Sequence, residues 1–190
     1  MSNSGVFDVN DIRYLMDYQQ WSGVGTLELI QTQTATGITD SDGYIDFTNI
    51  SSDVYNVHFF TWSVDTSNSA PLYLRFRESG TWETSSVYDY ANKYGDTGGS
   101  DGDEKDSSAT YIQLTTSFAG GITSGFVYFY NLGDAEKYSF TTHQAIKDEH
   151  YRYGSGLMHQ TSFVDGIRFG KTGSTSYDII HSSLYGIRYS

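Results

Sequence analysis

The chain has 190 residues and a formal net charge of −12, and 16% of its residues are aromatic, with 17 Tyr, 11 Phe and no cysteine. This charge repels the phosphates of DNA and RNA, so we do not expect nucleic-acid binding. The lack of cysteine excludes disulfides, thiolate catalysis and cysteine-based zinc sites. No signal peptide is visible, and no apolar run approaches the ~18 residues that span a membrane. One main domain is expected for this length.

Residues 1–24 predict an N-terminal anchoring arm, followed by a domain over residues 25–190. Within the arm, Val9–Gln20 is predicted to form a short helix with a narrow apolar stripe. A helix of about a dozen residues is marginal alone, so the stripe is expected to pack either on its own domain or on a neighbouring subunit. The stripe residues that we assign to assembly or anchoring are Ile12, Leu15 and Met16.

Three consecutive strands are predicted over Gly25–Val64, and we expect the rest of the chain to pair with them and cover them. Thr26–Thr34 is the first strand. Tyr44–Phe47 follows a polar turn that ends in Asp42-Gly43, a dipeptide typical of hairpins. Val54–Val64 is apolar on both faces, which is typical of a central strand between two covering layers.

The remaining chain continues as short strands separated by turns. Phe126–Tyr130 is again apolar on both faces, and we expect it to form a second sheet with Leu184–Tyr189 that covers one face of Val54–Val64. If that sheet leaves the other face open, a neighbouring subunit is expected to cover it. Further strands are predicted over Leu72–Arg77, Ser86–Lys93, Thr110–Ser117, Lys137–Thr142, Asp148–Tyr153, Leu157–Phe163, Val164–Phe169, Tyr177–Ile180 and Ser183–Tyr189.

Glycine residues are expected to interrupt this pattern of strands. Gly95–Ser108 carries five acidic residues and no large apolar one, so it predicts a solvated surface loop. The pair Gly154 and Gly156 is expected to end a strand, and Gly166 to mark a bulge. Roughly ten to twelve short strands without a helical repeat predict an all-β, antiparallel two-sheet β-sandwich of the jelly-roll kind.

An ordered set of strand motifs resembles the β-sandwich module of virion structural proteins from tailed phages of marine bacteria and cyanobacteria. The set runs from a TQTA strand to a closing LYGI, and the similarity covers residues 26–189. The motifs lie at Thr32–Ala35, Ile45–Thr48, Asp53–Phe60, Leu72–Gly80 and Leu184–Ile187.

This resemblance implies a non-enzymatic part of a virion, made in the host cytoplasm. Members of the family are similar to tail fibre, head fibre and capsid decoration proteins. Fibre proteins usually carry a long N-terminal shaft, whereas only residues 1–24 precede the module here. We therefore expect a capsid decoration protein or a short appendage, anchored by its N-terminus to other virion proteins. By analogy it forms a homo-oligomer, with a trimer as the expected state.

A second reading is host attachment, in which the protein binds a surface polysaccharide. Aromatic side chains near loop ends stack on sugar rings, although the same residues pack equally well inside a sandwich or a subunit interface. The aromatic residues assigned to ligand binding are Trp82, Tyr88, Tyr90, Tyr94, Tyr151 and Tyr153.

A third reading is a polysaccharide depolymerase, and the sequence supports it least. Asp148 and Glu149 are adjacent and point to opposite faces of a strand, so they are not the pair of carboxylates that a glycosidase holds ~5–9.5 Å apart. No HExxH, GxSxG or phosphate-binding glycine motif is present. We predict no catalytic residue and no cofactor, although a triad assembled from distant residues would escape this search.

Two acidic clusters offer oxygen ligands for a cation. The first combines Asp40, Asp42 and Asp46 around a glycine turn, but it lacks the length and final Glu of an EF-hand. The second cluster consists of Asp101, Asp103 and Asp106. A hairpin turn explains the first cluster and a solvated loop explains the second, so no metal site is predicted.

Overall fold

Two antiparallel sheets make up the part of the chain that the computed structural model describes, namely residues 27–38, 43–66, 71–115, 121–172 and 177–188. These ranges form 13 strands and no helix, which confirms the predicted all-β sandwich. The strands are β1 (Leu27–Ile38), β2 (Tyr44–Phe47), β3 (Val57–Thr66), β4 (Leu72–Glu78), β5 (Thr81–Trp82), β6 (Tyr88–Asp96), β7 (Asp101–Ala109), β8 (Ile112–Gln113), β9 (Gly121–Tyr130), β10 (Tyr138–Lys147), β11 (His150–Thr161), β12 (Val164–Lys171) and β13 (Tyr177–Ile187).

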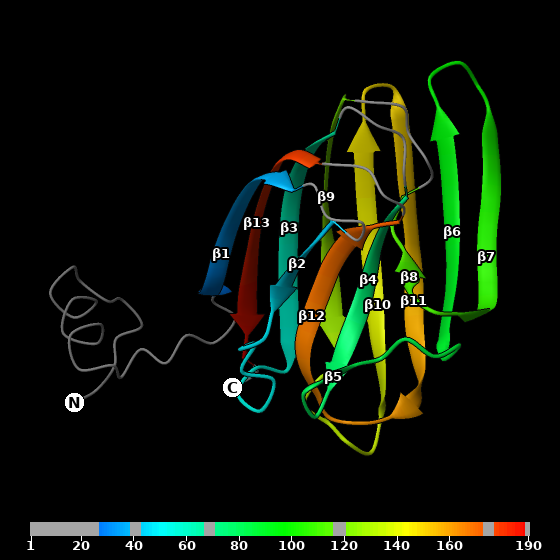
Figure 1. Ribbon diagram of the computed structural model, residues 1–190. Helices are drawn as coiled ribbons and strands as arrows, with labels where there is room; N and C mark the ends of the chain where they lie inside the picture. The colour runs from blue at the N-terminus through cyan, green and yellow to red at the C-terminus, as the bar shows by residue number, and fades with distance from the viewer. Residues whose placement is uncertain (1–26, 39–42, 67–70, 116–120, 173–176, 189–190) are drawn as a thin grey trace, which may run out of the picture.

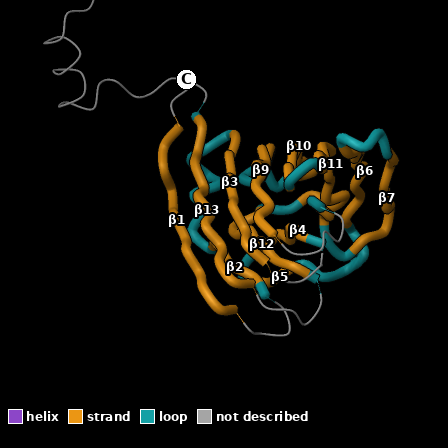
Figure 2. The backbone as a smooth tube through the Cα atoms, turned by 90° about the horizontal axis from the view of Figure 1, so that it is seen from above, coloured by secondary structure: helices purple, strands orange, loops and turns teal. Residues whose placement is uncertain are grey.

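The two sheets differ in size. The large sheet has eight strands in the order β1-β13-β3-β9-β10-β11-β6-β7, and the small sheet has five, β2-β12-β4-β5 with β8 paired to β4. The small sheet lies against one face of the large sheet (Figure 1). Seen from above, the large sheet follows an arc from β1 to β7, with the small sheet on its inner side (Figure 2). No helix in the described residues is long and apolar enough to cross a membrane.

Large apolar side chains fill the space between the sheets. Phe60, Trp62 and Val64 of β3 are buried at alternate positions, as the period of two along a strand requires. Phe169 of β12 meets them from the small sheet, with its ring centroid 5.3 Å from that of Phe60 and 5.4 Å from that of Trp62. Phe47 of β2 adds an edge-on contact with Phe60 at 5.5 Å. These contacts hold the two layers together.

The predicted three-stranded arrangement over Gly25–Val64 is wrong. β1 pairs with β13, β2 pairs with β12, and β3 lies between β13 and β9. β1 and β2 belong to different sheets, so Asp42-Gly43 does not join a hairpin. The reason is the burial of Phe47 against Phe60, which requires β2 and β3 to face each other across the sandwich rather than lie side by side.

The predicted composition of the second sheet is also wrong. Phe126–Tyr130 lies in β9 and Leu184–Ile187 in β13, and both strands are hydrogen-bonded neighbours of β3 in the same sheet. Cover for one face of β3 comes instead from the small sheet, through Phe47 and Phe169. The opposite face of β3 has no cover within the described part of the chain.

The acidic segment Gly95–Ser108 is not a loop, because most of it forms β7 and the end of β6. Arg152 of β11 explains the difference, since its side chain is fully buried and forms an ion pair with Glu104 of β7. On the other face, Lys93 bridges Asp101 and Asp103 at 3.2 and 3.1 Å. Charge pairing therefore replaces the apolar contacts that this strand lacks.

Two other predicted interruptions are wrong and one is confirmed. β11 runs unbroken through Gly154 and Gly156, where glycine is needed because an added Cβ would lie 2.0 Å from Asn92 and 2.5 Å from Ile112, respectively. The strand predicted at Leu157–Phe163 is thus the second half of β11. The two predicted C-terminal strands likewise form the single strand β13. The bulge at Gly166 is confirmed by a register shift in the pairing of β12 with β4.

A buried polar cluster lies beside Arg152 on the inner side of the large sheet. Asn92 Nδ2 donates to the backbone oxygen of Gln113 at 3.0 Å, which turns Asn92 Oδ1 toward His143 Nε2 at 2.6 Å. His143 Nε2 is therefore the donor in this contact. Burial, reinforced by the charge of Arg152, lowers the pKa of His143 to about 3. The helix predicted over Val9–Gln20, with Ile12, Leu15 and Met16, lies outside the described residues.

The ion pair of Glu104 with Arg152 should contribute to the stability of the fold. Glu104→Ala leaves the guanidinium buried without its carboxylate, so we expect the free energy of unfolding to fall by about 3–5 kcal/mol in urea denaturation. Asp103→Ala is the matched control on the same strand. Because Asp103 is 74% exposed, its removal should cost less than ~1 kcal/mol. Equal losses in the two variants would refute the buried pair.

His143 should make the free energy of unfolding depend on pH. Its folded-state pKa lies below the ordinary value of 6.5, so protonation favours the unfolded chain. Its contribution to stability is complete above pH 6.5 and is lost as pH falls toward 3. Between pH 7.5 and 5.0 we expect His143→Gln to lose about 2 kcal/mol less stability than the wild type. A pH profile for His143→Gln that runs parallel to that of the wild type would contradict the assignment.

Candidate functional site

The outer face of the large sheet, turned away from the small sheet, is rich in exposed apolar side chains. Leu29 on β1 is 60% exposed, Ile146 on β10 is 53% exposed and Phe140 on the same strand is 41% exposed. Isolated exposed apolar residues are normal, but a contiguous array of them marks a site of interaction. The strand registers divide this face into two halves.

The half over β13, β3 and β9 carries a cluster of four rings that we call the aromatic patch. Phe59 is at its centre, with ring-centroid distances of 4.7 Å to Tyr128, 5.9 Å to Phe126 and 6.1 Å to Tyr185. The four rings carry no charge. They form a continuous apolar surface beside the exposed Leu29, the register partner of Tyr185.

The half over β10, β11, β6 and β7 carries a groove of about 960 Å³, which we call the outer groove. Its size lies at the upper end of the ~300–1,000 Å³ typical of ligand pockets. Strand β9 contributes to one end of it through Tyr130. The residues that line the groove are Asp89, Tyr90, Ala91, Lys105, Asp106, Ser107, Tyr130, Phe140, Thr141, Thr142, Ser155, Gly156 and Leu157.

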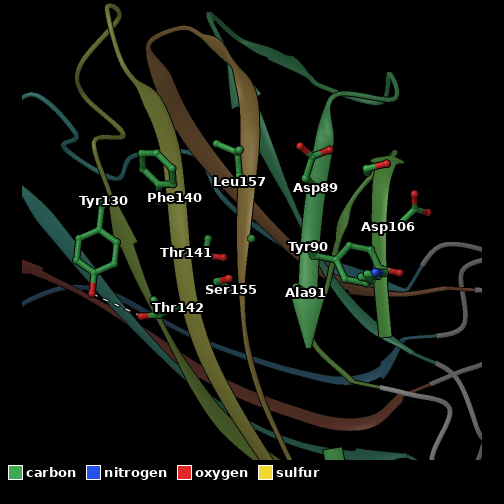
Figure 3. A pocket seen from close by; sticks show the side chains of 13 residues that line it. Asp89, Tyr90, Ala91, Asp106, Tyr130, Phe140, Thr141, Thr142, Ser155 and Leu157 are labelled. Atoms are coloured by element: carbon green, nitrogen blue, oxygen red, sulfur yellow. Dashed lines mark hydrogen bonds between the residues drawn. The ribbon is translucent and has the colours of Figure 1, made fainter. Parts of the chain in front are cut away.

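Strand register sets the direction of the outer groove. One row of register partners runs across the strands from Tyr130 through Phe140 and Leu157 to Asp89, and these larger side chains form a wall. The next row forms the floor, and its side chains on β10, β11 and β6 are small or short. Figure 3 shows the two rows at different levels of the strands. The floor residues are Thr142, Ser155, Ala91 and, at the end on β7, Lys105.

The lining of the outer groove combines apolar faces with hydroxyl groups. The Tyr130 hydroxyl lies 3.5 Å from Thr142 Oγ1, and the Ser155 side chain is exposed beside it (Figure 3). Asp89 is held by His159 Nδ1 at 3.2 Å. Lys105 forms no ion pair with a described residue. Such a mixture can hold a ligand that has both apolar and hydroxyl-bearing surfaces.

Two of the aromatic residues predicted from the sequence flank the floor of the outer groove. Tyr153 is 52% exposed and Tyr151 is 42% exposed. Their rings are stacked 6.3 Å apart at an angle of 7°. Since Tyr153 precedes Ser155 by two residues on β11, the stacked pair continues the same face of the sheet.

Of the other predicted aromatic residues, Tyr90 is part of the groove lining and the remaining three lie elsewhere. Tyr88 is fully buried, which excludes it from ligand contact, and burial raises the pKa of its hydroxyl well above the ordinary value. Tyr90 is half-buried, and burial beside Glu104 raises its pKa to about 12. The ring of Tyr94 lies 6.0 Å from the Arg152 guanidinium. Trp82 is on the small sheet, 4.3 Å from the guanidinium of Arg168. The six residues therefore do not form one site.

Sequence reasoning missed the residues that define the outer groove. Phe140 and Thr142 alternate along β10, and Ser155 and Leu157 alternate along β11, so the period of two was present in each strand. What the sequence lacks is the register that sets Phe140 beside Leu157 and Thr142 beside Ser155. Without that register, neither the wall nor the floor is apparent.

The carboxylates considered for cation binding have other partners. Arg168 donates two hydrogen bonds to Asp46 at 2.7 and 2.8 Å, while Asp40 and Asp42 lie outside the described residues. Asp106 accepts from the backbone N–H of Ser108 at 3.0 Å, and Lys93 bridges Asp101 and Asp103. No three metal-binding side chains gather anywhere in the described ranges.

Comparison with known proteins shows a likeness of fold. No family model and no curated protein matches the chain. Among solved structures, exo-inulinase from Aspergillus awamori is similar with a TM-score of 0.51 and 12% identity; the match covers 89% of this chain but only 31% of that one. The alginate lyase Aly36B gives a TM-score of 0.40 at 11% identity, covering 84% of this chain and 81% of its own. Galectin LEC-6 from Caenorhabditis elegans gives a TM-score of 0.32 at 9% identity, and the match covers 85% of this chain and 94% of the galectin. At 12% identity, the likeness to the exo-inulinase supports the β-sandwich fold alone.

Proposed function

We propose that the protein is a non-catalytic glycan-binding module that holds a surface polysaccharide in the outer groove. The observation that carries this proposal is the arrangement of the groove itself. Its wall of Tyr130, Phe140 and Leu157 stands beside a floor that bears the hydroxyls of Thr142 and Ser155.

Sugar rings present C–H faces and hydroxyl edges, and the outer groove offers a partner for each. Phe140 is exposed enough to stack on a ring face, because the aromatic face carries partial negative charge and attracts C–H groups. Thr142 and Ser155 hydroxyls both donate and accept hydrogen bonds. The stacked Tyr151 and Tyr153 extend the same surface.

The proposal is for binding without chemistry. His143 and Tyr88, which have strongly shifted pKa values, are buried on the inner side of the large sheet and do not line the groove. Asp89, a carboxylate that does line it, is engaged by His159. We therefore expect no release of new chain ends when the protein is mixed with a polysaccharide that it binds.

The experiment is a glycan array followed by calorimetry on the best binder. Ser155→Trp places an indole on the floor and should abolish binding, and Phe140→Ala should weaken it roughly tenfold, or about 1.4 kcal/mol. Tyr138→Ala is the matched control, because Tyr138 is on the same strand with 44% exposure against 41% for Phe140, but lies outside the groove lining. The wild-type Kd is expected for Tyr138→Ala, and also for Trp82→Ala on the small sheet.

Two results would count against this function. One is the absence of binding to any glycan on a broad array. The other is an equal loss of affinity in Phe140→Ala and Tyr138→Ala, because that result would place the ligand away from the groove.

A second candidate function is a structural protein of a phage virion, exposed on the capsid or on a short appendage. It is supported by the resemblance of the strand motifs and by the aromatic patch, which is uncovered in the described chain. A patch of this kind is suited to a subunit interface, where Tyr and Phe are enriched. A module of this kind can both assemble on a virion and bind a host glycan.

Light scattering tests this second candidate. We expect the wild type to form a homo-oligomer, with three chains by analogy, and Phe59→Lys to shift it toward monomers by placing a charge at the centre of the aromatic patch. Phe140→Lys is the control on the same face. A monomeric wild type that associates with no capsid or tail protein would rule this candidate out.

A further inference from the structure

We infer that the outer groove selects an uncharged polysaccharide chain, lying across the strands, over chains that carry carboxylate or sulfate groups. This inference rests on the proposed function and adds the class of ligand to it. It is argued from the charges that line the groove, from the pairing of the nearby cations and from the direction of the groove.

The groove lining offers no excess of positive charge. Asp89 and Lys105 lie on the groove side of β6 and β7, and their charges balance. Asp106 follows Glu104 by two residues and pairs with the half-buried Tyr90, so its side chain faces the opposite side of the sheet. The chain as a whole carries a net charge of −12. An acidic sugar would therefore meet the negative field of the chain with only Lys105 to offset it.

The other cations of the neighbouring strands are not available to an acidic ligand. Lys93, on the same face of β6, is held by both Asp101 and Asp103 at 3.2 and 3.1 Å. Arg152, on β11, is buried on the opposite side of the sheet, where it pairs with Glu104. Lys105 is thus the single cation among the described residues that lines the groove without a carboxylate partner, and it stands at one end.

Three of the arginines lie on the other side of the sandwich. Arg75, Arg77 and Arg168 belong to the small sheet, where Arg77 pairs with Asp165 and Arg168 with Asp46. Their guanidinium groups lie over the aromatic rings of Tyr44, Tyr73 and Trp82, none of which lines the groove. Acidic polysaccharides are commonly held by arginine, and within the described part of the chain the groove face offers no exposed arginine.

The rows of side chains give the direction of the ligand. The floor crosses from β10 through β11 and β6 to β7, and the wall begins at Tyr130 of β9. Five strands at ~4.8 Å spacing span ~19 Å, long enough for several sugar rings in line. The hydroxyls of Tyr130, Thr142 and Ser155 lie along this path and suit neutral hydroxyl groups.

The test uses pairs of polymers that differ only in charge. Alginate and polygalacturonate are each compared with their carboxyl-reduced forms, in which every uronate has become a neutral hexose, and a panel of neutral glucans, mannans and galactans is measured alongside. We expect neutral chains to bind at least tenfold more tightly than charged ones at 50 mM salt. Neutral binding should change less than twofold between 50 and 500 mM salt.

Charge variants locate the discrimination in the groove. Asp89→Asn removes the outward-facing carboxylate of the lining, changes the combined charge of positions 89 and 105 from 0 to +1, and should reduce the preference for neutral chains at least threefold. Asp148→Asn, at an exposed position outside the lining, is the matched control and should leave the preference unchanged.

The outcomes separate the inference from the proposed function. Tighter binding of alginate or polygalacturonate than of the reduced forms would overturn the inference and leave glycan binding standing. Failure to bind any polymer, charged or neutral, would overturn both. An unchanged preference in Asp89→Asn would show that discrimination does not come from the groove and would also defeat the inference.

Discussion

Phe60 and Trp62 of the large sheet pack against Phe169 of the small sheet, with ring centroids 5.3 and 5.4 Å apart, and these contacts fix which face of the large sheet is covered. A sheet of five strands lies against a sheet of eight, on one side only. Phe59, which alternates with Phe60 along β3, therefore points away from the core. The register that buries Phe60 turns Phe59 and the half-buried rings around it toward the outer face. The exposed face is thus a consequence of how the core is built.

That face has two halves with different chemistry. The aromatic patch is uncharged and continuous, which suits contact with protein, whereas the outer groove mixes rings with hydroxyls, which suits contact with sugar. Separate positions would let one sheet serve both the proposed assembly and the proposed ligand binding. On the small sheet, Arg77 and Arg168 are engaged by Asp165 and Asp46, and Arg168 also lies over the Tyr44 ring.

Local sequence patterns predicted the fold class but not the strand partners. Alternation in Leu72–Arg77 is enough to place β4, and the bulge at Gly166 follows from one glycine. Pairing between β1 and β13 joins residues such as Thr32 and Ser183, far apart in the chain, and no local pattern encodes that contact. The strand β7 was missed because its stability depends on the buried Arg152, a residue whose burial depends on the whole sheet. The groove was missed for the same reason, since it exists only when Phe140 and Leu157 lie side by side.

The most direct measurement is a map of backbone amide chemical shifts during titration with a neutral oligosaccharide. We expect saturating changes at Phe140, Thr142, Ser155 and Ala91, in a band across β10, β11 and β6, with the small sheet unaffected. Changes centred on Trp82 and Arg168 instead, or no saturable change with any neutral chain, would contradict a ligand site in the outer groove.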